Sequence, residues 1–230
     1  MDNAFRIGAI IVAAGSGLRF GELKQFKKLG IKPLYLYSLQ SFINCNLIDQ
    51  IVLVVPKDLL NTISNEASKL NPRINVVAGG KLRQDSVLAG VNGLSVNCDI
   101  VCVHDAARPF VSINLINKTI NACKENDGAI AALPSHDTVK DINVNDNRIK
   151  RTIPREKIWL AQTPQAFHRS QLKKALLYAK DNEIQVTDEA TLLESLNYSI
   201  VVIKGSNDNF KITTPHDWKL AELLLETNND

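Results

Sequence analysis

The stretch Ile7–Ala14, which reads IGAIIVAA, is a continuous run of small and apolar residues, and Gly15-Ser16-Gly17 follows it directly. Such a run is typical of a strand buried on both faces, as in a parallel sheet covered by helices. It is too short to span a bilayer, and no longer apolar run follows it. A buried strand that ends in a glycine-rich turn therefore predicts an α/β fold with this strand inside a parallel sheet.

Strand-like and helix-like segments alternate along most of the remaining chain. Further strands are predicted at residues 50–55, 74–77, 100–103, 129–133 and 199–203. Helices are predicted at residues 34–45, 57–70, 113–123, 172–179 and 188–196, after Ser86 as a capping residue, and from Thr214-Pro215 with Asp217 completing a capping box. This order predicts a Rossmann-like, mostly parallel sheet with helices on both faces. We expect one domain over residues 1–230.

The segment 137–155 departs from this alternation. It reads as two short strands around the turn cluster Asn145-Asp146-Asn147. A lone hairpin is only marginally stable in water, so it must pack on something. We interpret it as an inserted β-arm that reaches a second subunit.

Composition narrows the class of protein further. The 230 residues are 45% hydrophobic and 22% charged, as in globular proteins, and the net charge of +3 is too small to indicate nucleic-acid binding. No basic-then-apolar signal peptide opens the sequence. The four cysteines, Cys45, Cys98, Cys102 and Cys123, lack metal or redox spacing and are read as small buried hydrophobes. We therefore expect a cytoplasmic protein without a membrane-spanning segment.

Four loops that follow predicted strands carry the residues with chemical potential. They contain Gly15, Gly17, Arg19 and Lys24; Gly80, Arg83 and Ser86; His104, Asp105 and Arg108; and Lys211. Ligands of open parallel sheets bind at the carboxyl ends of the strands, so these loops are expected to converge. Cations and glycine-turn N–H groups suit a polyphosphate, and one carboxylate suits Mg²⁺. Read singly, each loop also fits a structural role: a plain turn, a solvated charged turn, a buried Asp–Arg pair, a structural histidine or a surface lysine.

Two common nucleotide-binding motifs are absent. Phe20 stands where the third glycine of the dinucleotide fingerprint would be, and no Gly-x-x-x-x-Gly-Lys-Ser/Thr occurs. The first absence counts against an NAD-binding oxidoreductase. Ser16 lacks the Gly-x-Ser-x-Gly elbow of a nucleophilic serine.

Together the motifs resemble those of the 2-C-methyl-D-erythritol 4-phosphate cytidylyltransferase family of the nonmevalonate isoprenoid pathway, from about Ile7 to Leu225. The residues that carry the resemblance are AAGSGLR (13–19), KQF (24–26), RQDSV (83–87), HDAARP (104–109), DTVK (137–140), QTPQ (162–165), TDEA (187–190) and NFKIT (209–213). Each motif is modest alone, and their joint order is specific.

The resemblance implies a nucleotidyltransferase that joins CTP to methylerythritol phosphate and releases pyrophosphate. It implies catalytic roles for Arg19, Lys24 and Lys211, and Asp105 as the residue beside Mg²⁺. The implied nucleotide site comprises Ala13, Ala14, Gly15, Gly17, Gly80, Arg83, Ser86, Asp105 and Ala106. The implied acceptor site comprises Arg108, Thr163 and Thr187, with Thr138 and Arg155 contributed across a homodimer by the arm.

Two alternatives stay open at this point. A ribitol-5-phosphate cytidylyltransferase would share the fold and the chemistry, although that group typically has Ala-Gly-Gly in the first loop and Asp-Ala-Val-Arg-Pro in the third. A catalytically inactive nucleotide-binding regulator is the alternative of another class. The presence of Arg19, Lys24 and Lys211 disfavours the regulator.

Overall fold

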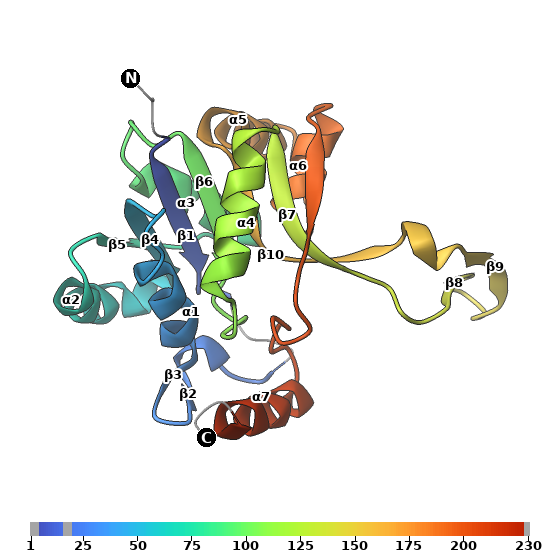
Figure 1. Ribbon diagram of the computed structural model, residues 1–230, viewed down its shortest axis with the longest axis horizontal. Helices are drawn as coiled ribbons and strands as arrows, with labels where there is room; N and C mark the ends of the chain where they lie inside the picture. The colour runs from blue at the N-terminus through green and yellow to red at the C-terminus, as the bar shows by residue number, and fades with distance from the viewer. Residues whose placement is uncertain (1–4, 16–19, 228–230) are drawn as a thin grey trace.

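A computed structural model describes residues 5–15 and 20–227 and contains a seven-stranded sheet between two layers of helices (Figure 1). The strand order is β11-β7-β10-β6-β1-β4-β5. The strands are β1 (Ile7–Val12), β4 (Gln50–Val55), β5 (Ile74–Ala78), β6 (Ile100–Asp105), β7 (Gly128–Pro134), β10 (Trp159–His168) and β11 (Ile200–Lys204). Only β10 runs antiparallel to its neighbours in this sheet. The predicted mostly parallel α/β fold is confirmed.

The apolar run at the start of the chain forms β1, which lies between β4 and β6. Its side chains alternate between the two faces of the sheet. Ile11 packs in one apolar cluster with Phe42 and Ile116, whereas Ile10 packs in the other with Val87. Both isoleucines are completely buried, which explains why the strand is apolar at every position.

Two helical layers supply those clusters. One face is covered by α1 (Leu34–Ile43), α2 (Leu60–Leu70) and α4 (Ile113–Lys124), and the other by α3 (Arg83–Gly93), α5 (Arg169–Asp181) and α6 (Glu189–Ser195). Short 3-10 turns, η1 (Lys24–Phe26) and η2 (Lys57–Leu59), lie before α1 and α2. None of the helices in the described ranges has both the length and the apolar character needed to cross a bilayer.

The C-terminal helix α7 (Pro215–Thr227) lies below the sheet in Figure 1, beside the two-stranded ribbon of β2 (Lys28–Leu29) and β3 (Lys32–Pro33). Trp218 and Ala221 pack there with Leu29 in a third apolar cluster. The predicted capping box is present, because Asp217 N–H donates to Thr214 Oγ1 at 3.2 Å and Asp217 Oδ2 accepts from Thr214 N–H at 2.7 Å.

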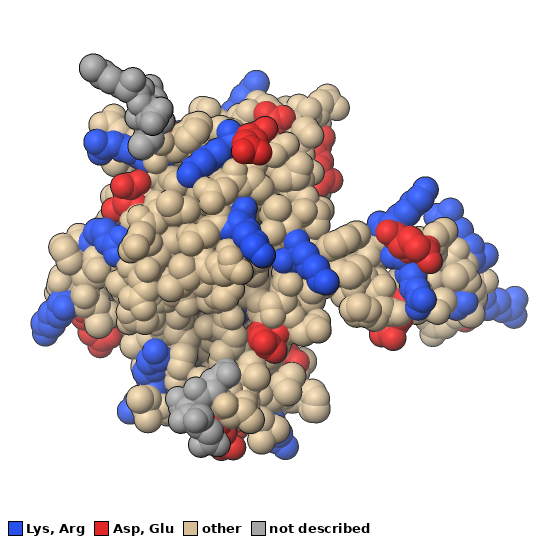
Figure 2. Space-filling view, in the orientation of Figure 1, with Lys and Arg blue, Asp and Glu red and all other residues tan. Residues whose placement is uncertain are grey.

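The segment 137–155 forms the predicted hairpin, with β8 (Val139–Ile142) paired to β9 (Ile149–Ile153). A short 3-10 turn, η3 (Arg155–Lys157), leads from it into β10. In Figure 1 the hairpin projects to the right, away from the sheet. Its apolar side chains are largely exposed in this chain: 85% for Val144 and 64% for Ile149. Figure 2 shows Lys and Arg interspersed with Asp and Glu on the visible face, with no continuous basic stripe.

Two local predictions differ from the structure. Strand β10 was not predicted, because Gln162, Thr163 and Gln165 interrupt its apolar pattern and its pairing with β7 shifts register between Ala161 and Gln165. Ser86 is not the cap of α3. It is the fourth residue of that helix, which begins after Leu82, and Asp85 Oδ2 accepts from the Leu82 N–H at 3.0 Å. The four cysteines are free and buried, as predicted.

A glycine on α3 tests the contact between this helix and β1. A Cβ at Gly90 would lie 2.5 Å from Ile10 Cγ2, and Ile10 is fully buried. Gly90→Ala should therefore lower the free energy of unfolding by about 1–3 kcal/mol, although alanine is the better helix former. Chemical denaturation measures this change. Asn92→Ala, at an exposed position on the same helix, is the control, and a stabilised Gly90→Ala variant would contradict the packing described.

Candidate active site

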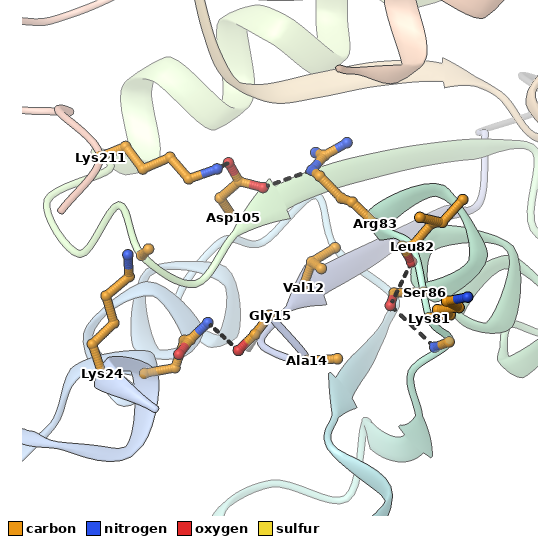
Figure 3. Close-up of a pocket in the computed structure, with 13 residues that line it drawn as sticks. Val12, Ala14, Gly15, Lys24, Lys81, Leu82, Arg83, Ser86, Asp105 and Lys211 are labelled. Atoms are coloured by element: carbon orange, nitrogen blue, oxygen red, sulfur yellow. Dashed lines mark hydrogen bonds and ion pairs between the residues drawn. The ribbon is translucent and has the colours of Figure 1, made fainter. Parts of the chain in front are cut away.

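A cavity of about 580 Å³ opens at the carboxyl-terminal ends of β1 and β6 (Figure 3). Its walls come from the loops after β1, β5 and β6 and from the segment after β11. The lining residues are Val12, Ala14, Gly15, Lys24, Gln25, Gly80, Lys81, Leu82, Arg83, Ser86, Asp105, Ala107 and Lys211. Loops distant in sequence thus meet at one sheet edge, as the parallel topology predicts.

Two tight turns form the wall nearest β1 and β5. A Cβ at Gly79 would collide with Ala14 and lie 2.9 Å from Ser86 Oγ, so the two turns touch only because Gly79 has no side chain. The Gly80 N–H donates to Ser86 Oγ at 3.2 Å, and this hydroxyl donates to Leu82 O at 3.2 Å. Small residues and backbone groups therefore line this side, where a ligand can approach the main chain closely.

The charged wall centres on Asp105, the last residue of β6. Asp105 Oδ1 accepts from Arg83 Nε at 3.1 Å, and Oδ2 accepts from Lys211 Nζ at 2.7 Å (Figure 3). Burial alone would raise the pKa of this carboxyl, but Arg83, Lys211 and Arg108 hold it well below its usual value. Asp105 is therefore a buried carboxylate that stays ionised.

Arg83 also bonds a second carboxylate. Its Nη1 donates to both oxygens of Glu189, at 2.6 and 2.7 Å, and Glu189 is completely buried. Burial alone would lower the pKa of Arg83, but the Asp105 and Glu189 carboxylates raise it above its ordinary value. Burial raises the pKa of Glu189, and Arg83 opposes that shift. The chain of contacts therefore runs from Glu189 through Arg83 and Asp105 to Lys211.

A second cavity, of about 210 Å³, adjoins the first. Arg83, Asp105 and Lys211 line both cavities. The other residues of the second cavity are Arg108, Ala161, Gln162, Thr163, Gln165, Thr187 and Asp188. The two spaces thus share one charged wall.

Arg108 is the buried cation of the second cavity. Its Nη1 donates to Asn209 O at 2.9 Å and its Nη2 to Ala161 O at 3.4 Å, while Nε, also buried, has no hydrogen-bond partner among the described residues. Among the described residues, no carboxylate forms a salt bridge with Arg108. Burial lowers the pKa of Arg108, as expected for a cation paired mainly with carbonyl groups. An anion in this cavity would supply Arg108 with the charged hydrogen-bond acceptor that it lacks among the described residues.

A buried hydrogen-bond chain fixes the turn between Asp105 and Arg108. The Asp105 N–H donates to Thr163 Oγ1 at 3.0 Å, and this hydroxyl lies 3.0 Å from His104 Nδ1. His104 Nε2 lies 3.1 Å from Arg108 O. Since a carbonyl only accepts, Nε2 carries the proton and the Thr163 hydroxyl donates to Nδ1. Burial lowers the pKa of His104 to about 4, so it is neutral at pH 7 and has the structural role that its environment indicates.

The structure gathers most of the residues expected at the site. Eight of them line the first cavity: Ala14, Gly15, Lys24, Gly80, Arg83, Ser86, Asp105 and Lys211. Arg108, Thr163 and Thr187 line the second. The side chains of Ala13 and Ala106 are fully buried in the apolar cluster that contains Ile11, and neither residue lines either of the two cavities.

The remaining expected residues lie elsewhere. Gly17 and Arg19 fall outside the described ranges. Thr138 and Arg155 are exposed at the arm, away from both cavities, and Arg155 Nη1 donates to His136 O at 2.8 Å. Lys81 and Ala107 line the first cavity and Glu189 bonds Arg83, although none of the three was among the assigned site residues. Lys81 is a cation of a loop that was expected to favour an anion, and Glu189 belongs to the motif TDEA.

Comparison with known proteins identifies the family of the chain. Residues 7–227 match the family model described as IspD, 2-C-methyl-D-erythritol 4-phosphate cytidylyltransferase. Proteins of that name from Syntrophus aciditrophicus and Clostridioides difficile are 39% and 40% identical over 226 and 220 residues. These alignments cover 96% and 94% of this chain and 96% and 92% of the relatives.

A solved structure shows the same fold. The 4-diphosphocytidyl-2C-methyl-D-erythritol synthase from Anaerococcus prevotii superposes with a TM-score of 0.88 at 34% identity, covering 97% of both chains. The match thus extends over the arm as well as the sheet. With the family model and the full-length relatives, these similarities establish that the chain belongs to the IspD family of cytidylyltransferases, nucleotidyltransferase enzymes of isoprenoid biosynthesis.

Proposed function

We propose that this chain transfers the cytidylyl group of CTP to 2-C-methyl-D-erythritol 4-phosphate, giving 4-diphosphocytidyl-2-C-methyl-D-erythritol and pyrophosphate. The relatives are named for this acceptor and this reaction. The observation that carries the proposal is the wall of Arg83, Asp105 and Lys211 that both cavities share. Ligands in the two cavities meet at this wall, as the two substrates of a transfer reaction must.

Each cavity suits one substrate. The first combines close backbone turns with Lys24, Arg83 and Lys211, a combination that suits a nucleoside triphosphate. The second is smaller and contains Arg108, whose buried Nε lacks a hydrogen-bond partner in the part of the chain that the structure describes. A phosphate monoester supplies the anionic oxygens that this guanidinium lacks. We therefore assign CTP to the first cavity and the acceptor phosphate to the second.

The assignment leads to an in-line displacement. An oxygen of the acceptor phosphate attacks the α-phosphorus of CTP, a new P–O bond forms, and the bond from the α-phosphorus to the bridging oxygen breaks as pyrophosphate leaves. Negative charge grows on the equatorial and leaving oxygens. Lys24 and Lys211, which line the first cavity, stabilise this charge together with Arg19. Positioning and charge stabilisation thus account for catalysis without a covalent enzyme intermediate.

The residues present fit one Mg²⁺ ion that is held jointly with the nucleotide. Within the described ranges no group of three or more His, Cys, Asp or Glu side chains could hold a metal. Asp105 is an ionised carboxylate on the shared wall, and Mg²⁺ commonly combines one or two carboxylates with phosphate oxygens. When bound, the ion would neutralise phosphate charge. Asp105 would then exchange contacts with Lys211 or Arg83 for contacts with the ion.

The arm supports a homodimer with shared active sites. Ile142, Val144 and Ile149 are exposed in the isolated chain, although a hairpin needs packing partners to be stable. We propose that the arm packs on a second copy and delivers Thr138 and Arg155 to that copy's acceptor cavity. Two equivalent arms would then complete two equivalent sites.

Pyrophosphate release tests the proposed reaction directly. Release should require CTP and methylerythritol phosphate together, with little turnover of the other nucleoside triphosphates. Ribitol 5-phosphate serves as the competing acceptor in the same assay. Preferential turnover of ribitol 5-phosphate would reassign the acceptor, and release that needs no acceptor would contradict the transfer reaction.

Lys211→Ala tests the charged wall. We expect kcat to fall by about 100- to 1000-fold, because a preorganised cation is lost where transition-state charge develops. The dissociation constant for CTP, measured by calorimetry, should change much less. Lys204→Ala, at an exposed position on β11, is the control. An unchanged kcat in Lys211→Ala would refute the assigned role.

Arg108→Gln tests the acceptor cavity. Loss of a charged donor should raise the KM for methylerythritol phosphate by roughly 10- to 100-fold, while the KM for CTP stays near the wild-type value. Steady-state kinetics with each substrate varied in turn separates the two effects. Arg6→Gln, on an exposed segment before β1, is the control. A rise confined to the KM for CTP would show that Arg108 acts on the nucleotide and not on the acceptor phosphate.

Mixing two inactive variants tests the shared sites. If Arg155 acts across the dimer, Arg155→Ala mixed with Lys211→Ala forms heterodimers in which one site has both wild-type residues. Refolding the two variants together should then restore about one quarter of wild-type activity, since half of the dimers are mixed and each has one intact site. An absence of recovery in a mixture shown to contain heterodimers would place Arg155 in its own chain's site.

A further inference from the structure

We propose that Glu189 is a positioning residue for the nucleotide cavity, acting through Arg83. The inference rests on the proposed function because it takes CTP as the ligand of that cavity. Glu189 is the first residue of α6, lines neither of the two cavities and is completely buried. Within the described part of the chain, its side chain reaches the site through two bonds to Arg83, of 2.6 and 2.7 Å.

Asp105 and Glu189 accept hydrogen bonds from different nitrogens of the Arg83 guanidinium. Nε donates to Asp105 and Nη1 donates to Glu189, so the plane of the group is fixed from two sides. Nη2 makes no hydrogen bond within the described part of the chain, and Arg83 lines both cavities. Since a guanidinium has five N–H donors in a rigid fork, fixing two of its nitrogens orients the third. Nη2 is therefore available to a phosphate oxygen or another acceptor of the nucleotide.

Glu189 also limits how Arg83 can pair with Asp105 on the shared wall. Without it, Asp105 would be the one carboxylate of the described residues in contact with Arg83, and the guanidinium could turn to bond Asp105 through two nitrogens. Such a turn would withdraw donors from the nucleotide cavity and increase competition for the Asp105 oxygens. The bonds to Glu189 hold Arg83 to a single contact with Asp105.

The segment that precedes Glu189 is held by hydrogen bonds on both sides, as a positioning role requires. On the α3 side, Gln84 Nε2 donates to Ile184 O at 2.8 Å, and Gln84 Oε1 accepts from the Val186 N–H at 3.2 Å. On the sheet side, Gln165 Nε2 donates to Asp188 Oδ2 at 2.9 Å. Arg83 precedes Gln84 on helix α3. The bonds of Gln84 to Ile184 and Val186 therefore hold the segment before Glu189 close to the helix that carries Arg83.

A double-mutant cycle on CTP affinity tests the inference. Glu189→Gln keeps the shape of the side chain and one acceptor but removes the charge. We expect it to weaken CTP binding by about tenfold in calorimetry, and Arg83→Gln to weaken it at least as much. The double variant should bind CTP within about twofold of Arg83→Gln alone, because Glu189 has nothing left to position. Glu194→Gln, exposed on the same helix, should bind like the wild type.

The alternative outcomes are distinct. A purely structural role of Glu189 would lower the melting temperature and the binding-competent fraction without changing the dissociation constant for CTP. The inference would equally be overturned if the losses of CTP affinity in the two single variants multiplied in the double variant. Glu189→Asp keeps the charge but shortens the side chain that reaches Arg83. If Glu189→Gln does not fold, Glu189→Asp replaces it in the same measurement of CTP affinity. A wild-type chain that fails to bind CTP would contradict the proposed function, whereas wild-type affinity in Glu189→Gln would contradict this inference alone.

Discussion

The ionised carboxylate of Asp105 is the interaction on which the site depends. A buried charge is stable only when its loss of hydration is offset by close partners, and Asp105 has Arg83 at 3.1 Å and Lys211 at 2.7 Å. These partners come from α3 and from the segment after β11, which are far apart in sequence. The carboxylate therefore holds these two cations together at the wall that both cavities share. Without it, Arg83 would keep Glu189 as a carboxylate partner, whereas Lys211 would lose the ion pair that it forms within the described part of the chain.

The sheet determines where that carboxylate lies. Strand β6 ends at Asp105, and β1 beside it ends at Val12, in register with Asp105, before the small-residue turn. The antiparallel strand β10 passes on the other side of β6 and brings Thr163 to the Asp105 N–H. The pairing with β1 and the hydrogen bond to the Thr163 hydroxyl thus position the main chain of Asp105 from two directions, while its side chain remains at the shared wall.

Sequence was a good guide where structure follows from local pattern. Apolar runs such as Ile7–Ala14 predicted the parallel strands, because strands buried on both faces have no polar alternation. The rule for carboxyl-terminal strand ends then predicted that Arg83, Asp105 and Lys211 lie together. The roles of these residues remain predictions. The arm was recognised as a hairpin, but its partner cannot be read from one chain.

The missed features depend on tertiary context. Strand β10 contains Gln162, Thr163 and Gln165, which are buried but have polar partners, so its sequence lacks a strand pattern. Glu189 looks like an ordinary surface glutamate at a helix start until the fold brings it to Arg83 of α3. Ala107 lines the cavity and Ala106 does not, a distinction set by the turn after β6 that composition cannot reveal.

The position of β10 also affects the order in which the sheet can be assembled. Strands β6 and β7 both pair with β10, which therefore separates the pair β11-β7 from the group β6-β1-β4-β5. In the order of synthesis, β6 and β7 both leave the ribosome before the strand that joins them, and the arm residues emerge in between. The hydrogen-bonding edges of β6 and β7 that face β10 have no strand partner until then. The strands β6 and β7 become part of one sheet only when the segment carrying Thr163 is inserted between them, and the same strand supplies Ala161, Gln162, Thr163 and Gln165 to the second cavity.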